Sequence, residues 1–154
     1  NKYFYYSLKQ FLLHEVFLKK KYITFINDSK ATSFQATKTA LASSKNIYWI
    51  LGGLPKKKDK IDLKNLKYNI IKSYIIGKDI NFFKKQLKNK VKFSVEVNLK
   101  KAVVSVLKDI RLLKKNKSTV LLSPSAASFD QFKNFEQRGN VFKKLSRLYV
   151  KKFI

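Results

Sequence analysis

Three short polar segments carry side chains that could bind a small anion. The segments comprise residues 27–32, 52–56 and 123–135, and their candidate ligands are Lys30, Thr32, Lys56 and Ser128. Each segment directly follows an apolar run that is typical of a β-strand. Ammonium and hydroxyl groups donate hydrogen bonds and could converge on carboxylate or phosphate oxygens. The pattern alone is equally compatible with ordinary loops in which Ser and Thr cap the following helices.

Residues typical of the common catalytic centres do not occur together in this sequence. His14 is the only histidine and cysteine is absent, which makes a histidine metal cluster, a thiolate metal site and a catalytic triad implausible. The phosphate-binding patterns GxxxxGK[ST] and GxGxxG are also absent. We therefore expect neither a catalytic residue nor a metal site within the chain itself.

The positions of apolar residues predict alternating strands and helices. Strands are expected at residues 22–26, 46–51, 73–76, 91–97 and 119–122, and helices at 33–43, 63–69, 79–88, 98–113 and around 142–149. The packing face of the first helix is expected to contain Ala36, Ala40 and Leu41. Such alternation predicts a Rossmann-like α/β fold, with a mostly parallel sheet of about five to six strands and helices on both faces. In such a sheet the polar segments emerge together at the carboxyl edge, where ligands bind and helix N-termini offer N–H groups.

The strong positive charge of the chain suggests a second function. Lys and Arg number 35 against 9 Asp and Glu, which gives a formal net charge of +26. This excess would suit a non-enzymatic module that binds nucleic acid. However, the arginines are only Arg111, Arg138 and Arg147, and the lysines are spread over the whole chain. Since readers of bases and phosphates rely on arginine, we regard nucleic acid as the less favoured partner.

The chain is long enough for one domain, which we place at residues 21–154. Residues 1–20 are rich in aromatic side chains and weakly periodic, and we interpret them as a linker and the end of a preceding domain against which the aromatics pack. The chain starts at Asn1 and contains no methionine, so we expect it to be part of a longer protein. No apolar run approaches a membrane span and no signal peptide is recognisable, which favours the cytoplasm.

Three motifs, in order and at suitable spacing, resemble one enzyme family. They are NDSKATS at residues 27–33, LGG at 51–53 with Lys56, and SPSAASFDQFKNFEQRGN at 123–140. From about residue 12 to its end the chain is similar to the C-terminal domain of the UDP-N-acetylmuramoyl-L-alanine:D-glutamate ligases, the D-glutamate-adding Mur ligases. The resemblance implies a Rossmann-like lid that follows a UDP-sugar domain and a central domain with the ATP and Mg²⁺ sites. It also implies peptidoglycan synthesis, in which an acyl phosphate is attacked by the amine of D-glutamate.

The resemblance also implies roles for individual residues. D-Glutamate would be held by Lys30, Thr32, Lys56, Ser128, the backbone N–H of Phe129 and the aromatic wall Phe135. Asp28 would contact the ATP ribose when the lid closes. We expect the neighbouring polar residues to brace the loop by hydrogen bonds; they are Asp130, Gln131, Asn134, Glu136 and Arg138.

The chain departs from the family pattern before its first predicted strand. The family carries a Pro-His-Arg segment there, and His14 could match the His, but no arginine is nearby. A related Mur ligase that uses a different amino acid is a further alternative, against which the NDSKAT motif argues.

Overall fold

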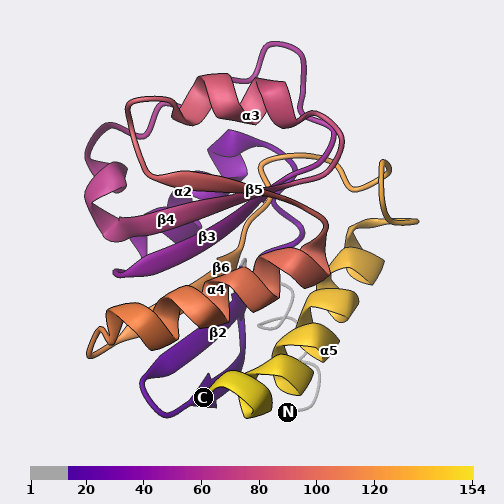
Figure 1. Cartoon of the computed structure of the whole chain (residues 1–154). Coiled ribbons are helices and arrows are strands. Elements are labelled where there is room, and N and C mark those ends of the chain that lie inside the picture. The colour runs from indigo at the N-terminus through magenta and orange to yellow at the C-terminus, as the bar shows by residue number, and fades with distance from the viewer. Residues whose placement is uncertain (1–13) are drawn as a thin grey trace, which may run out of the picture.

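The computed structural model describes residues 14–154 and shows a six-stranded sheet between two layers of helices (Figure 1). The strands are β1 (Glu15–Lys20), β2 (Ile23–Asn27), β3 (Ile47–Gly52), β4 (Ile70–Ile76), β5 (Phe93–Val97) and β6 (Ser118–Leu122). The helices are α2 (Phe34–Ala42), the 3₁₀-helix η1 (Lys64–Asn69), α3 (Ile80–Leu87), α4 (Leu99–Leu113) and α5 (Phe135–Phe153).

The order of the strands brings the three polar segments together. The sheet runs β1-β2-β6-β3-β4-β5, in which β1 is antiparallel to β2 and all other neighbours are parallel. Strand β6 lies between β2 and β3, with Leu122 opposite Asn27 on one side and Ile50 on the other. The loops after β2, β6 and β3 therefore leave the sheet side by side, as the parallel alternation predicted.

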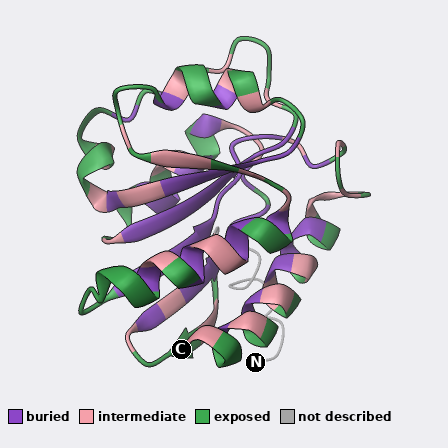
Figure 2. Ribbon diagram, in the orientation of Figure 1, coloured by how far each residue is buried: buried purple, intermediate pink, exposed green. Residues whose placement is uncertain are grey.

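Helices cover both faces of the sheet, which confirms the predicted fold class. One face of the sheet packs against α4 and α5 through Phe25, Tyr48 and Tyr74. The other face packs against α2 and α3, where Trp49 of β3 and Phe83 of α3 belong to the same buried cluster. In Figure 2 the central strands are buried, whereas the outer sides of α3, α4 and α5 are exposed. Because both faces are covered, the inner strands are mostly apolar instead of strictly alternating, most clearly β3 with the sequence IYWILG, which is buried at every position.

Side-chain caps fix where three helices begin. Ser33, Asn98 and Asn134 each accept a hydrogen bond from a backbone N–H in the first turn of α2, α4 and α5, respectively. Ser33 and Asn98 are the first residues of the helices expected at 33–43 and 98–113. Asp79, the first residue of the helix expected at 79–88, makes no side-chain hydrogen bond to the start of α3. By contrast, α5 begins at Phe135, well before the predicted start, because Asn134 caps it within the polar segment.

The predicted packing face of the first helix was partly wrong. Ala36 is exposed, whereas Phe34, Thr37, Ala40 and Leu41 are buried in α2. A buried Thr37 needs hydrogen-bond partners inside the protein, and these are described below.

Strand β1 was not predicted. Its sequence EVFLKK has charged ends and lies at the sheet edge, so its apolar periodicity is weak. Phe17 packs on Phe25 and Phe142, with ring centroids 6.1 and 5.4 Å apart, and thus contacts this domain. The other aromatics of the predicted linker, at residues 3–11, lie outside the described residues. The domain boundary near residue 20 stays a prediction.

Within the part of the chain that the structure describes, none of the helices combines the length and the apolar character needed to span a membrane.

Candidate ligand-binding site at the carboxyl edge of the sheet

Backbone hydrogen bonds join the three loops at the carboxyl edge. The N–H of Asp28 donates to the carbonyl of Leu122 at 2.8 Å, and that of Gly52 donates to Pro124 at 2.9 Å. Leu54 and Ala127 exchange two N–H···O bonds, each 2.9 Å long. The loop after β6 is thus fixed to both neighbouring loops before any ligand is considered.

The Gly-Gly pair is required by this close approach. Gly52 and Gly53 have φ angles of +126° and +135°, which side-chain-bearing residues rarely adopt. A Cβ on Gly52 would lie 1.9 Å from the carbonyl oxygen of Ile76, and one on Gly53 would lie 2.2 Å from that of Ala127. The pair therefore allows the β3 loop to pass directly against β4 and the loop after β6.

A buried chain of hydroxyl groups ends at the carboxylate of Asp28. Ser123 Oγ donates to Asp28 Oδ2 at 2.6 Å, Ser123 Oγ and Thr37 Oγ1 are 2.9 Å apart, and Ser125 Oγ donates to Thr37 at 2.8 Å. Each hydroxyl has one proton and an ionised carboxylate only accepts, so the proton order that satisfies every group runs from Ser125 through Thr37 and Ser123 to Asp28. The chain links α2 to the loops after β2 and β6.

Burial controls the ionisation of Asp28, which is only 3% exposed. Desolvation raises the pKa of its carboxyl group from 3.8 to about 6, and the Ser123 hydrogen bond and the nearby His14 oppose the rise. His14 Nδ1 lies 3.7 Å from Asp28 Oδ1. The predicted contact to an ATP ribose would require this carboxylate to become more exposed, and that role stays a prediction.

We expect Asp28→Asn to stabilise the chain at pH 7 by about 1–3 kcal/mol. The folded state keeps this proton up to about pH 6, whereas the unfolded chain releases it near 3.8. Stability is therefore lost as the pH rises through this window, and the ionised group remains unfavourable at pH 7. Urea unfolding at pH 4 and pH 7 measures the effect, which should nearly vanish at pH 4. Exposed Asp62→Asn is the control; equal effects of both variants at pH 7 would contradict the prediction.

Arg138 connects the polar loops from inside the protein. It is only 1% exposed, and its guanidinium donates to Ser29 Oγ at 2.9 Å, to the Ser29 carbonyl at 2.7 Å and to the Ala126 carbonyl at 3.0 Å. Ser29 Oγ in turn donates to the Phe135 carbonyl at 2.8 Å. Burial lowers the pKa of Arg138 to about 10, which still leaves it charged at neutral pH. The loops after β2 and β6 are thereby attached to the start of α5.

The other predicted bracing residues hold the far part of the same segment. Asp130 Oδ2 accepts from the Lys78 N–H at 2.9 Å, and Gln131 Nε2 donates to the Val97 carbonyl at 2.8 Å. The segment thus crosses the ends of β4 and β5 before Asn134 caps α5. Glu136 is exposed in the first turn of α5, where its charge suits the positive helix end.

Two of the predicted D-glutamate ligands border one cavity. Lys30 and Phe135 lie on a cavity of about 690 Å³, which is also lined by His14, Asn27 and Lys143 among others. Lys143 Nζ contacts the Glu15 carboxylate at 3.2 Å, so that part of its charge is already compensated. Lys30 is exposed, and it brings an ammonium group to a cavity with an aromatic wall.

The other predicted ligands belong to segments around the start of α2. Thr32 precedes the cap Ser33, and the turn from Lys56 to Asp59 is attached to α2 because Asp59 Oδ2 accepts from the Phe34 N–H at 2.8 Å. The bridge between Leu54 and Ala127 then brings the Lys56 segment beside that of Ser128. Since Asp59 and Ser33 already accept N–H groups of α2, a ligand here would depend mainly on side chains.

Exposure differs among these predicted ligands. Lys56 is exposed and Thr32 half-buried, and the side chain of Phe129 is 70% exposed, which fits the predicted use of its backbone only. Ser128 is buried, and its carbonyl accepts from the N–H groups of Gln131 and Phe132. The structure therefore collects the predicted ligands on neighbouring loops at one edge, while only Lys30 and Phe135 share the cavity.

Sequence reasoning missed Thr37 and Lys143, and it assigned no individual role to Asn27, the first residue of the motif at residues 27–33. Thr37 had a detectable signal, because it is the polar member of the i, i+3 series that begins at Phe34 on the buried face of α2. Lys143 carried none, since it is one of many lysines in a lysine-rich chain. In residues 14–154 no three or more His, Cys, Asp or Glu side chains are grouped so that they could hold a metal ion.

Fold and site together define a Rossmann-like α/β domain whose polar loops meet at the carboxyl edge of a mostly parallel sheet. The chain is homologous to the UDP-N-acetylmuramoylalanine--D-glutamate ligases. It is 42% identical over 124 residues to that ligase of Rhizobium meliloti (strain 1021), 42% over 125 residues to that of Mesorhizobium japonicum, and 40% over 129 residues to that of a Wolbachia of Brugia malayi.

These alignments cover 80%, 81% and 84% of the chain, respectively. They cover only 27%, 27% and 26% of the relatives, so the chain corresponds to about a quarter of their length. No family model matches the chain. The homology confirms the resemblance seen in the three motifs.

Proposed function

We propose that this chain is the C-terminal lid domain of an ATP-dependent ligase that adds D-glutamate to UDP-N-acetylmuramoyl-L-alanine. The observation that carries the proposal is the identity of about 40% over four fifths of the chain to D-glutamate ligases. The joined loops at the carboxyl edge support it, because they carry the motifs of the resemblance. The reaction belongs to peptidoglycan synthesis in the cytoplasm, and the chain alone would be inactive.

In this proposal the chain binds and orients D-glutamate. The ligand has two carboxylates, for which Lys30 and Lys56 supply charge and Thr32 and Ser128 supply hydroxyl groups. Phe135 borders the cavity beside Lys30 and would pack against the aliphatic part of the ligand. Fixing both carboxylates would position the amine for attack on the acyl phosphate, which is an effect of orientation.

ATP and Mg²⁺ would be bound mainly by a central domain outside this chain. The residues that the structure describes do not fit a metal site, because they contain no suitable group of ligands. Phosphorylation of the alanine carboxylate would take place on that central domain. The lid would add D-glutamate and exclude water when it closes.

We expect Lys30→Ala and Lys56→Ala to raise the KM for D-glutamate by about tenfold or more in a full-length ligase that carries this segment. Each variant removes one cation from a carboxylate, while the ATP site is left intact. Steady-state kinetics with D-glutamate and ATP varied separately measure both constants. Lys57→Ala, an exposed neighbour in the same turn, is the matched control.

An unchanged KM and kcat in both variants would contradict the proposed binding of D-glutamate by Lys30 and Lys56. A panel of amino acids tested on the unmodified enzyme separates the proposed ligase from a related one. Preference for an amino acid without a second carboxylate would overturn D-glutamate as the substrate.

A further inference from the structure

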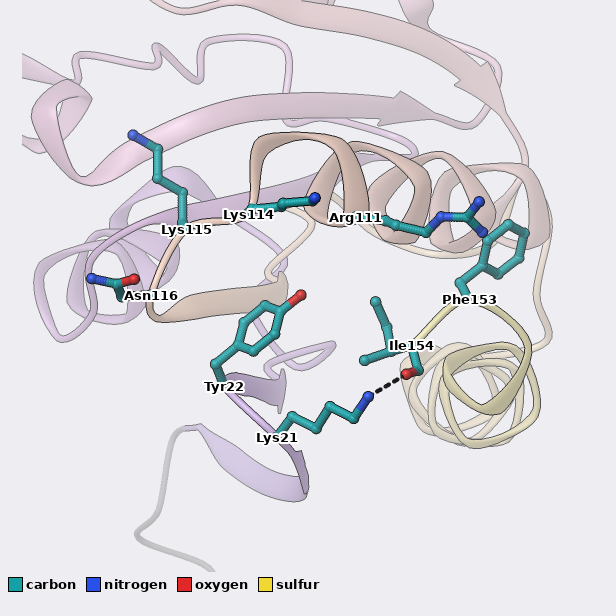
Figure 3. A pocket seen from close by; sticks show the side chains of 8 residues that line it. All are labelled: Lys21, Tyr22, Arg111, Lys114, Lys115, Asn116, Phe153 and Ile154. Carbon is teal, nitrogen blue, oxygen red and sulfur yellow. Dashed lines mark hydrogen bonds between the residues drawn. The ribbon is translucent and has the colours of Figure 1, made fainter.

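A second, basic pocket lies at the opposite edge of the sheet. Figure 3 shows it between the turn that joins β1 to β2, the end of α4 and the end of α5. Its volume is about 420 Å³, and its cations are Lys21, Arg111, Lys114 and Lys115. This edge carries the amino ends of β2 and β6, so the pocket is separate from the polar loops described above.

The charges around this pocket are not balanced locally. Among the described residues that line it none is acidic. Lys21 Nζ donates to the main-chain oxygen of Ile154 at 2.6 Å, which fixes the position of its ammonium group. In the 154-residue chain this oxygen belongs to the terminal carboxylate, so that the cations without an acidic side chain beside them in the pocket are Arg111, Lys114 and Lys115. Mutual repulsion of cations in a concave site is relieved when an anion binds between them.

The pocket also offers hydrogen-bond donors and apolar walls. In Figure 3 the hydroxyl of Tyr22 and the ammonium groups of Lys21 and Lys114 face the same hollow, with Arg111 extending toward Phe153 on its far side. Arginine provides the planar fork that suits phosphate oxygens, and the tyrosine hydroxyl can donate one further bond. Lys115 lies at the rim of the pocket, where it contributes to the positive electrostatic potential more than to direct contact with a ligand.

Two of these lysines occupy positions where the backbone favours other residues. Lys21 and Lys114 have φ angles of 52° and 47°, in the left-handed region that glycine and asparagine adopt most readily. Cations near the C-terminus of a helix are common by themselves, and that accounts for Arg111 and Lys114. It also applies to Lys21, whose ammonium group donates to Ile154 at the end of α5. It does not account for the convergence of cations from the β1–β2 turn and from the end of α4 on the same hollow.

We propose that this pocket binds a small anion with two or more linked phosphate groups, such as a free diphosphate or the diphosphate part of a larger compound. Lys21, Lys114 and Arg111 would hold the phosphate oxygens, with a further hydrogen bond from Tyr22. The volume is within the range of small-molecule sites. The proposal does not depend on the ligase function.

Isothermal titration of the 154-residue chain with inorganic pyrophosphate at physiological salt tests the proposal. The double variant Lys21→Asn, Lys114→Asn removes two pocket cations, and asparagine tolerates their left-handed backbone. The matched control is Lys100→Gln, Lys108→Gln, which removes two exposed lysines of α4 outside the pocket. Thermal unfolding of both variants verifies that the fold is retained.

We expect the pocket variant to weaken pyrophosphate binding by about tenfold or more, and the control to change it by less than about twofold. Equal weakening in both variants would show attraction by the overall positive charge and overturn the proposal. So would the absence of measurable binding to the unmodified chain. A parallel titration with single-stranded DNA identifies a nucleic acid as the ligand if DNA binds more tightly and only the pocket variant loses it.

Discussion

Arg138→Met is expected to lower the free energy of unfolding of the chain by about 3 kcal/mol. The substitution keeps an apolar side chain of similar length but removes every donor of the guanidinium. The carbonyls of Ser29 and Ala126 and the hydroxyl of Ser29 would then be buried without their partners. Part of this loss is offset because the variant no longer buries a charged group. The burial of that charge is unfavourable, which is why the pKa of Arg138 is lowered.

Urea unfolding at pH 7 measures the effect of this substitution. Arg147→Met is the matched control, because Arg147 is an exposed arginine of the same helix, and we expect it to change stability by less than about 1 kcal/mol. If Arg138→Met were as stable as the unmodified chain, the buried guanidinium would not be what holds the loops to α5.

Gly52→Ala should destabilise the fold by at least about 3 kcal/mol. The new Cβ would be placed 1.9 Å from the carbonyl oxygen of Ile76, at a φ of +126°. The Cβ position is fixed by the backbone of β3 and the oxygen belongs to the backbone of the neighbouring strand β4, so no side-chain rotation can relieve the contact. The end of β3 would have to separate from β4, and the loop that carries Lys56 would move with it.

Gly139→Ala in α5 is the control for this prediction. Its Cβ would come nearest to the end of the Asn27 side chain, at 2.8–3.3 Å, which can shift by rotation, and alanine favours a helix more than glycine does. We expect a change within about 1 kcal/mol. Comparable unfolding midpoints for Gly52→Ala and Gly139→Ala would show that the β3–β4 contact is more adaptable than its geometry indicates.

The sequence predicted the fold correctly wherever apolar runs alternated with polar segments. The parallel strands, the helices on both faces and the meeting of three loops at one edge all followed from that alternation. The order of the strands did not need to be known for the last prediction, because every loop after a parallel strand emerges at the same edge. Arg138 was correctly expected to brace the loop by hydrogen bonds, and its guanidinium makes three of them.

The features that were missed depend on contacts distant in sequence. Strand β1 is held by pairing with β2, and its own residues are mixed in polarity. Thr37 is polar within a short helix, and its partners Ser123 and Ser125 lie 86 and 88 residues away. The cavity beside Lys30 depends on Lys143 of α5, whose position relative to β2 cannot be derived from local pattern.

The bridge between Leu54 and Ala127 has a thermodynamic consequence for any ligand of this edge. Two loops that would otherwise sample many conformations separately are fixed to each other by paired backbone hydrogen bonds. The entropy of ordering them is lost when the chain folds and does not have to be lost again on binding. A ligand held by both loops would therefore bind a pre-organised surface, and movement of this edge toward another domain would carry both loops together.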